Sequence, residues 1–280
     1  MITDVSLVSL LAAAQAHHQG IGAFNVVLLE HAEAIVTGAE RVSLPVILQI
    51  SENCIAYHGG LAPIALASRE IARAASVDVL VHLDHIEDAE LIKEGIELGV
   101  QSVMFDASRL PYADNIVATR EMADYCHARG VGIEAELGEV GGKDGVHAAG
   151  ARTDPSEAAR FVEQTGVDAL AVAVGTSHAM RDRVAAVDHG LIAALRASVP
   201  VPLVLHGSSG LPDDEIRAAV RSGMTKINIS THLNGLFTNS IREVLDEEPE
   251  TVDPRRYVRR GRDAIATETA RLLELLAQPN

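Results

Sequence analysis

The chain has 280 residues, a formal net charge of −16 at pH 7, and apolar residues at 48% of its positions. The negative charge disfavours binding to nucleic acid and to anionic membrane surfaces, because both carry charge of the same sign. Aromatic residues make up only 3% of the chain and none is tryptophan, so stacking platforms for bases or sugar rings are not expected.

The cysteines and the N-terminal segment predict a cytoplasmic protein. Cys54 and Cys126 show no CxxC spacing, which is typical of small core residues in a reducing compartment. The first residues lack the basic region of a signal peptide and are better explained by an amphipathic first helix. No uninterrupted apolar run reaches the roughly 18 residues of a membrane span, so no membrane contact is predicted.

Short β-favouring segments recur along almost the whole chain, and helical patterns follow most of them. The predicted strands are GAFNV (22–26), VILQIS (46–51), VLVHLD (79–84), SVMFDA (102–107), GIEAEL (132–137), ALAVAVG (169–175), PLVLHG (202–207) and KINIST (226–231). The clearest helix start is Asp154-Pro155, an N-cap residue followed by proline at the first helical position.

Eight strands that alternate with helices indicate an α/β fold, a single (β/α)8 TIM barrel over residues 1–280. A C-terminal helical and basic segment is expected at about 249–280. The alternative is a doubly wound sheet, which usually has fewer strands and a GxGxxG motif after the first one. That motif is absent at this position in the sequence.

Polar residues end or follow every predicted strand, where a barrel of this kind carries its active site. They are Asn25, Ser51, Asp84, His85, Asp106, Glu136, His178, His206 and the segment Asn228 to Thr231. Three of them are histidines, which is the ligand number of a catalytic zinc site that keeps one position open for substrate. The metal interpretation depends on the barrel register, because no local HxH or HExxH spacing supports it.

Two further segments predict binding sites. HGSSG (206–210) and NIST (228–231) follow the last two strands, where backbone N–H groups and a helix N-terminus commonly bind phosphate in this fold. The glycine-rich segment 138–153 is long enough to be a functional loop.

Six ordered motifs resemble the class II, zinc-dependent ketose-bisphosphate aldolases, which include the fructose- and tagatose-bisphosphate enzymes. The motifs are HLDH (82–85), SVMFDAS (102–108), EAELGEVGG (134–142), AVGTSH (173–178), LVLHGSSG (203–210) and KINIST (226–231). The resemblance runs from about Gly22 to the DPRR segment at Arg255. It implies a lyase of carbohydrate metabolism, as in glycolysis, that cleaves a ketose (bis)phosphate to dihydroxyacetone phosphate and an aldehyde.

The resemblance also implies roles for individual residues. A zinc ion would be held by His85, His178 and His206, and Asp84 would move a proton at the aldehyde oxygen. Asp106 and Glu136 resemble an alternative or second metal site, and Glu136 could instead support a zinc ligand. Substrate contacts are implied for Asn25, Ser51, Ala179, Gly207, Ser208, Ser209, Asn228, Ile229, Ser230 and Thr231. Arg255 would reach the distal phosphate in a neighbouring subunit, which implies a homodimer or homotetramer, and a monovalent cation (Na⁺ or K⁺) would lie near the phosphate.

The sequence departs from the family pattern at several positions. Ala179 replaces a usual glycine, Arg181-Asp182-Arg183 follows it, and Ile86 replaces a frequent histidine or polar residue. The glycine-rich loop is one residue shorter, so Asp144 is the candidate for its catalytic acid/base. These departures leave two alternatives: an aldolase for a modified or deoxy sugar phosphate, and a non-catalytic partner subunit of an aldolase complex. A Schiff-base aldolase using Lys226 is a third.

Overall fold

The computed structural model describes residues 5–137, 152–176 and 183–278, and its strands form one closed, parallel barrel. Strand order follows the sequence, and β1 closes the barrel by pairing with β8. The strands are β1 (Ile21–Asn25), β2 (Val46–Ser51), β3 (Val79–Ile86), β4 (Ser102–Phe105), β5 (Gly132–Glu136), β6 (Ala169–Ala171), β7 (Leu203–Leu205) and β8 (Met224–Ile229). The predicted (β/α)8 architecture is therefore confirmed.

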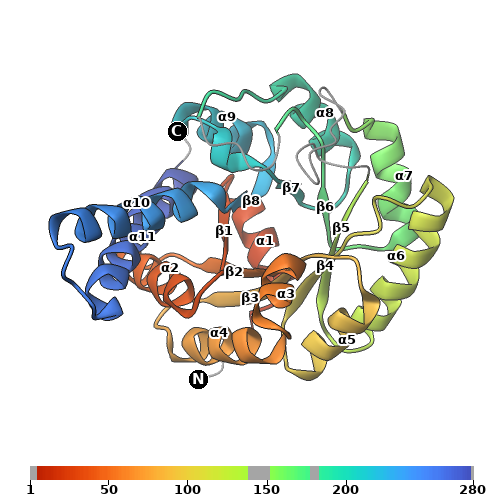
Figure 1. Cartoon of the computed structure of the whole chain (residues 1–280). Helices are drawn as coiled ribbons and strands as arrows, with labels where there is room; N and C mark the ends of the chain where they lie inside the picture. Colours follow the sequence, from red (N-terminus) through yellow and green to blue (C-terminus); the bar gives the residue numbers. More distant parts are fainter. Residues whose placement is uncertain (1–4, 138–151, 177–182, 279–280) are drawn as a thin grey trace.

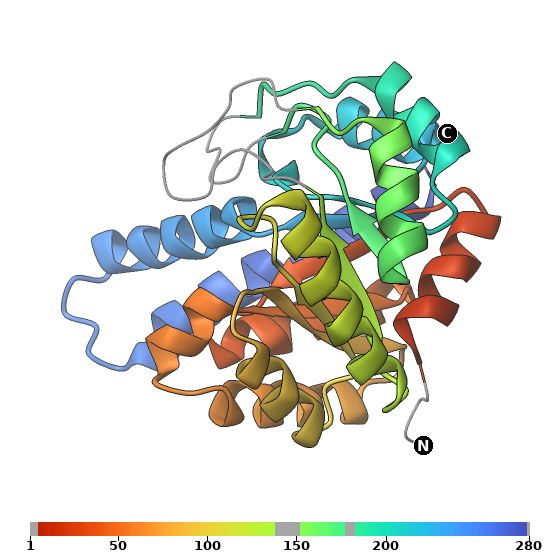
Figure 2. The same ribbon diagram turned by 90° about the vertical axis from the view of Figure 1, so that its right-hand side faces the viewer.

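The described helices mostly surround the barrel, and α1 lies across its amino-terminal end (Figure 1). They are α1 (Leu7–Ala16), α2 (Leu29–Val42), α3 (Glu52–His58), α4 (Ala62–Ala74), α5 (Ala89–Glu97), α6 (Tyr112–His127), α7 (Pro155–Thr165), α8 (His189–Ser198), the short 3-10 helix η1 (Ser208–Gly210), α9 (Asp213–Ser222), α10 (Thr231–Glu247) and α11 (Pro254–Ala277). The connection between α10 and α11 projects from the barrel in both views (Figures 1 and 2). None of the described helices combines the length and apolar character needed to cross a membrane.

Side-chain alternation divides each strand between two environments. Outward residues such as Leu83 and Ile133 pack against the helices in the main hydrophobic core. Inward residues change character with depth, and β3 shows this most clearly: Leu80 lies in a second apolar cluster, whereas His82 and Asp84 are buried polar residues further along. The barrel interior therefore becomes polar towards the carboxyl ends of its strands.

Helix α1 closes the amino-terminal end of the barrel. Its residues Leu7 and Leu11 are fully buried and belong to the same cluster as the inward residues Ile47, Leu80 and Val204. The predicted first helix thus supplies an apolar base, and polar chemistry is confined to the opposite end.

Strands β6 and β7 are shorter than predicted. Beyond Ala171 the chain pairs with a connecting segment, since the Ala173 amide donates to Thr153 Oγ1 at 2.8 Å and the Thr153 amide donates to the Ala173 carbonyl at 3.0 Å. The β-favouring composition of 169–175 therefore extends past the strand of the barrel itself.

Candidate active site

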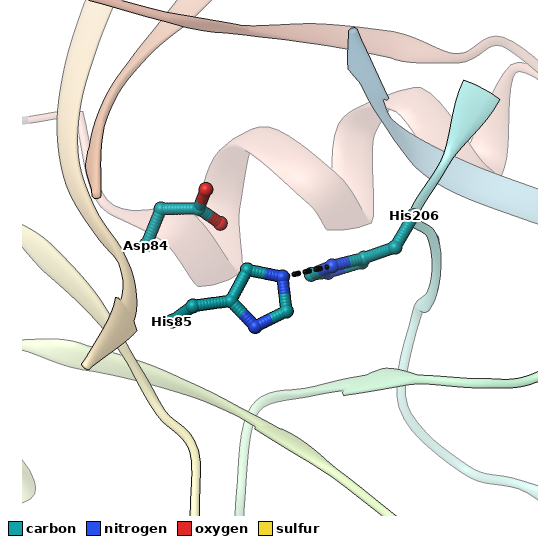
Figure 3. A group of neighbouring side chains, drawn as sticks. All are labelled: Asp84, His85 and His206. Atoms are coloured by element: carbon teal, nitrogen blue, oxygen red, sulfur yellow. Dashed lines mark hydrogen bonds between the residues drawn. The ribbon is translucent and has the colours of Figure 1, made fainter. Parts of the chain in front are cut away.

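Near its end, strand β3 carries two adjacent residues, Asp84 and His85, whose side chains both face the mouth of the barrel (Figure 3). Adjacent residues of a regular strand point to opposite faces. Here His85 has a positive φ of 51°, and the β3–β4 register shifts between Leu83 and Ile86. A left-handed conformation is uncommon for residues other than glycine, and at such an irregularity it is typical of functional sites. It explains how neighbouring residues serve the same site.

His85 and His206, from β3 and the end of β7, meet across the mouth. The Nε2 atom of His85 lies 2.8 Å from Nδ1 of His206, with the two rings nearly perpendicular at 86° (Figure 3). The second nitrogen of each ring meets a carboxylate. His85 Nδ1 lies 2.8 Å from Asp106 Oδ2, and His206 Nε2 lies 2.9 Å from Glu134 Oε1.

These contacts define which ring nitrogens face each other. A carboxylate accepts a hydrogen bond, so His85 Nδ1 and His206 Nε2 are expected to carry their hydrogens. The lone pairs of the other two nitrogens then point at each other across 2.8 Å. A proton or a metal cation between them relieves that repulsion. Imidazoles oriented by carboxylates in this way are typical of zinc ligands, so the donor set fits a zinc ion.

Asp84 lies beside this pair and is almost fully buried, with 4% of its surface exposed. Asn25 donates from Nδ2 to Asp84 Oδ2 at 2.9 Å, whereas Oδ1 has no hydrogen-bond partner among the described residues. Burial alone would raise the pKa of this carboxyl, but His85 and His206 oppose it and hold the pKa below its usual value. Asp84 is therefore an ionised carboxylate with one oxygen available to a ligand.

Two sets of potential ligand atoms share His85. Asp84, His85 and His206 have ligand atoms within 4.8 Å of one another, and the same holds for His85, Asp106 and Glu136. Glu136 Oε2 lies 3.8 Å from His85 Nδ1, further than Asp106. Asp106 is thus the closer carboxylate partner of His85, and Glu136 is a neighbour of that contact.

The protonation of His85 reflects these carboxylates. Burial alone would lower the pKa of its imidazole, but Asp84, Asp106 and Glu136 outweigh burial and raise the pKa to about 9. In the metal-free protein the His85 ring therefore holds an extra proton at neutral pH, and a metal ion must displace this proton to bind.

The residues after β7 and β8 form a turn next to the histidines. Gly207 adopts a positive φ of 67°, a conformation that glycine allows, and Ser208 and Ser209 follow it in η1. The Ser230 amide, at the start of α10, donates to Ser209 Oγ at 3.2 Å. The two predicted phosphate-binding segments are therefore in direct contact.

The residues next to this turn differ in how they can contact a ligand. The side-chain amide of Asn228 lies 3.1 Å from His206 Nε2, and Thr231 begins α10. The Ile229 side chain packs in the main hydrophobic core, which leaves only its backbone for ligand contact. Arg183 donates to the Leu211 carbonyl at 2.7 Å and to Asp213 at 2.6 Å, bracing the segment that follows the turn.

The remaining predicted site residues lie at a strand end, on the surface, or outside the described residues. Ser51 is the register partner of Asp84 in the β2–β3 ladder, and its hydroxyl caps α3 by accepting from the Cys54 amide at 3.2 Å. Arg255 is 86% exposed in its side chain and pairs with Asp253 at the start of α11, away from the histidines. Asp144, His178 and Ala179 lie outside the described residues.

In the polar layer beneath the mouth, reasoning from sequence missed Glu134 and considered Lys226 only as a Schiff-base nucleophile. Glu134 contacts His206, and its other oxygen lies 2.9 Å from Lys226 Nζ. The available signal was the strand period, since Glu134 precedes Glu136 by two residues and Lys226 precedes Asn228 by two. Ile86, which replaces a frequent histidine or polar residue of the family, is fully buried in the main core.

Comparisons with known proteins agree on one family. The sequence model described as "Fructose-bisphosphate aldolase class-II" matches residues 5–280. The YdjI aldolase from Escherichia coli K12 is 31% identical, with a TM-score of 0.85 and coverage of 97% of each chain. A candidate fructose-1,6-bisphosphate aldolase from Coccidioides immitis is 29% identical, with a TM-score of 0.86 and coverage of 98% of this chain and 96% of that chain. Fructose-bisphosphate aldolase from Campylobacter jejuni, 23% identical with a TM-score of 0.80 over 97% of this chain and 95% of that one, has the same fold.

Proposed function

Because this chain belongs to the class II fructose-bisphosphate aldolase family, we propose that it is a zinc-dependent aldolase. Its substrate class is a ketose (bis)phosphate, such as fructose or tagatose 1,6-bisphosphate, which it cleaves reversibly to dihydroxyacetone phosphate and an aldehyde. The observation that carries the proposal is the pair of imidazole nitrogens 2.8 Å apart, each ring oriented by a carboxylate and both beside buried Asp84.

The proposed zinc ligands are His85, His206 and His178, the last of which lies outside the described residues. When bound, zinc supplies a Lewis acid that polarises the ketose oxygens and stabilises the negative charge left by carbon–carbon cleavage. Asp106 and Glu134 hold the two described histidines in the required orientation. Asp106 and Glu136 also remain candidates for a second metal position.

Asp84 is proposed to exchange a proton with the hydroxyl of the aldehyde half. Cleavage turns that hydroxyl into a carbonyl, so a base must accept its proton, and condensation requires the reverse transfer. An ionised Asp84 with one oxygen lacking a hydrogen-bond partner among the described residues suits this role. Asn25 holds the other oxygen and thereby orients the carboxylate.

The substrate phosphate is proposed to bind where η1 meets the start of α10. Gly207 brings the backbone close, and the N-terminus of α10 favours an anion. Local donors matter here because the net charge of −16 opposes an anionic ligand at long range. A monovalent cation beside this phosphate is part of the proposal.

The distal phosphate is proposed to bind Arg255 of a second copy of the chain. Arg255 is 86% exposed at the start of α11, next to the connection that projects from the barrel (Figures 1 and 2). The active protein would then be a homodimer or homotetramer. Light scattering of the purified protein checks this, and a molar mass of one chain at assay concentration would contradict it.

A Schiff-base mechanism at Lys226 fits the structure poorly. Lys226 is fully buried, and its Nζ atom lies against Glu134, whose other oxygen contacts His206. Among the described residues, the amine is therefore engaged below the histidines and buried from solvent.

The proposed function is tested by retro-aldol cleavage of a panel of ketose phosphates, including deoxy and other modified sugars. We expect release of dihydroxyacetone phosphate, loss of activity with a chelator, and recovery with zinc. Zinc binding without cleavage of any panel member, followed by activation of a separate aldolase chain on mixing, would favour the partner-subunit alternative. Cleavage that survives complete zinc removal would contradict the proposal.

Zinc binding is predicted to strengthen as pH rises. His85 holds a proton with a pKa of about 9 in the metal-free protein, and coordination requires that proton to leave. Below that pKa, the apparent zinc affinity should rise about tenfold per pH unit if one proton is released. Competition with a chromophoric chelator between about pH 6.5 and 8.5, corrected for the chelator's own titration, measures the slope. An affinity independent of pH would contradict the prediction.

A further inference from the structure

A buried ion pair lies directly beneath the histidine cluster. Glu134 of β5 uses Oε1 to contact His206 Nε2 at 2.9 Å and Oε2 to contact Lys226 Nζ of β8 at 2.9 Å. The three side chains are fully buried. Glu134 thus connects Lys226 to a proposed zinc ligand.

We propose that Lys226 is a positioning residue: it holds the Glu134 carboxylate against His206 and so orients the ring whose Nδ1 faces His85. This inference rests on the proposed zinc site and extends it below the mouth of the barrel. It assigns a purpose to a buried cation that the proposed reaction does not otherwise use.

The physical basis is the cost of burying a carboxylate. An isolated ion inside a protein is strongly disfavoured, and a buried pair persists only when good geometry compensates both charges. Lys226 Nζ lies within ion-pair distance of Glu134 Oε2. The next basic group with a described contact to this oxygen is His82, whose Nε2 lies 3.9 Å from it. Without the ammonium group, the Glu134 carboxylate would lose its compensating charge, and we expect it to move away from His206.

The strand arrangement makes this contact rigid. Lys226 and Glu134 are inward residues in the middle of β8 and β5, and neither lies on a loop. His82 occupies the same layer and donates or accepts at Ser102 Oγ, 2.7 Å from its Nδ1. The barrel therefore fixes the backbones of both residues, and the contact with Lys226 fixes where the Glu134 carboxylate points relative to His206.

Zinc affinity measured without substrate tests the inference. Lys226→Met removes the charge and keeps an unbranched side chain, and we expect zinc binding about 10- to 100-fold weaker, as for other supports of metal ligands. Ser102→Ala is the matched control, because it alters the same buried layer at His82 without a described contact to His206; its zinc affinity should equal wild type. Lys226→Arg, which keeps the charge, should recover part of the loss.

A double-mutant cycle identifies the route of the effect. If Lys226 acts through Glu134, Lys226→Met should change zinc affinity little in a Glu134→Gln background. An equal loss in both backgrounds would overturn the proposal, as would wild-type zinc affinity in folded Lys226→Met. Should Lys226→Met fail to fold, Glu134→Gln breaks the same contact from the other side, and unchanged zinc affinity there overturns it too.

The same measurements separate this inference from the proposed function. A wild-type protein that binds no zinc would defeat the zinc aldolase itself. A wild-type protein that binds zinc and cleaves a ketose phosphate, with Lys226→Met indistinguishable from it, would defeat only the positioning role. Borohydride trapping of substrate on Lys226 would also overturn that role, because it would make the lysine a nucleophile.

Discussion

Replacing His206 by alanine is expected to abolish stoichiometric zinc binding and to reduce aldol cleavage by about 1,000-fold or more. The variant removes Nδ1, the atom that faces His85 Nε2 at 2.8 Å. The charge stabilisation that a metal provides is worth several kcal/mol, and each 1.36 kcal/mol is about tenfold in rate. Elemental analysis of the protein and the retro-aldol assay give the two readouts.

His127→Ala is the control for losing a histidine. His127 also contacts a carboxylate, Asp168 Oδ2 at 3.0 Å, but it lies at the end of α6 and outside the cluster. That variant should keep wild-type zinc content and activity. A His206→Ala protein that retained full activity in the presence of a chelator would show that the paired imidazoles do not support the chemistry.

Asp84→Asn is expected to separate metal binding from turnover. The amide keeps the shape of the side chain but cannot accept the hydroxyl proton, so cleavage should fall by about 100- to 10,000-fold. Zinc content should stay stoichiometric, because the proposed ligands are the histidines. Exchange of the C3 hydrogen of dihydroxyacetone phosphate with solvent, which precedes contact with the aldehyde, should survive.

The matched control for this substitution is Asp88→Asn. Asp88 is the N-cap residue of α5, where its Oδ1 accepts from the Glu90 amide at 2.9 Å. Because asparagine caps a helix about as well as aspartate, this variant should fold normally and leave catalysis unchanged. Zinc loss from Asp84→Asn would instead make Asp84 a ligand, and a full rate with intact zinc would remove it from the proton transfer.

The barrel could be predicted because β-favouring segments recur along the chain and helical patterns follow most of them. The Asp154-Pro155 start is confirmed: Asp154 accepts from the amides of Ser156 and Glu157 at the beginning of α7. Strand ends were harder to predict, as the chain beyond Ala171 shows. Amino-acid composition predicts where the backbone favours an extended conformation. The end of a barrel strand depends instead on which neighbouring segment pairs with it.

The mouth residues could be predicted from their positions at strand ends, but the layer below them could not. The sequence gives Glu134 no role and suggests Lys226 only as a Schiff-base nucleophile, and only the closed barrel brings their side chains together across its interior. Likewise, alternation predicts that Asp84 and His85 point apart. The positive φ of His85 turns both side chains to the same side, and the HLDH motif alone does not predict it.

The left-handed backbone at His85 also limits how this chemistry could be transferred to another scaffold. Grafting the dipeptide Asp-His onto a regular strand of a designed barrel would send one of the two side chains into the helical shell. A working transplant must copy the irregularity as well, with a neighbouring strand whose ladder tolerates the offset seen between Leu83 and Ile86. A transfer must therefore include the irregular segment of β-sheet around Asp84 and His85, because the residue pair alone does not suffice.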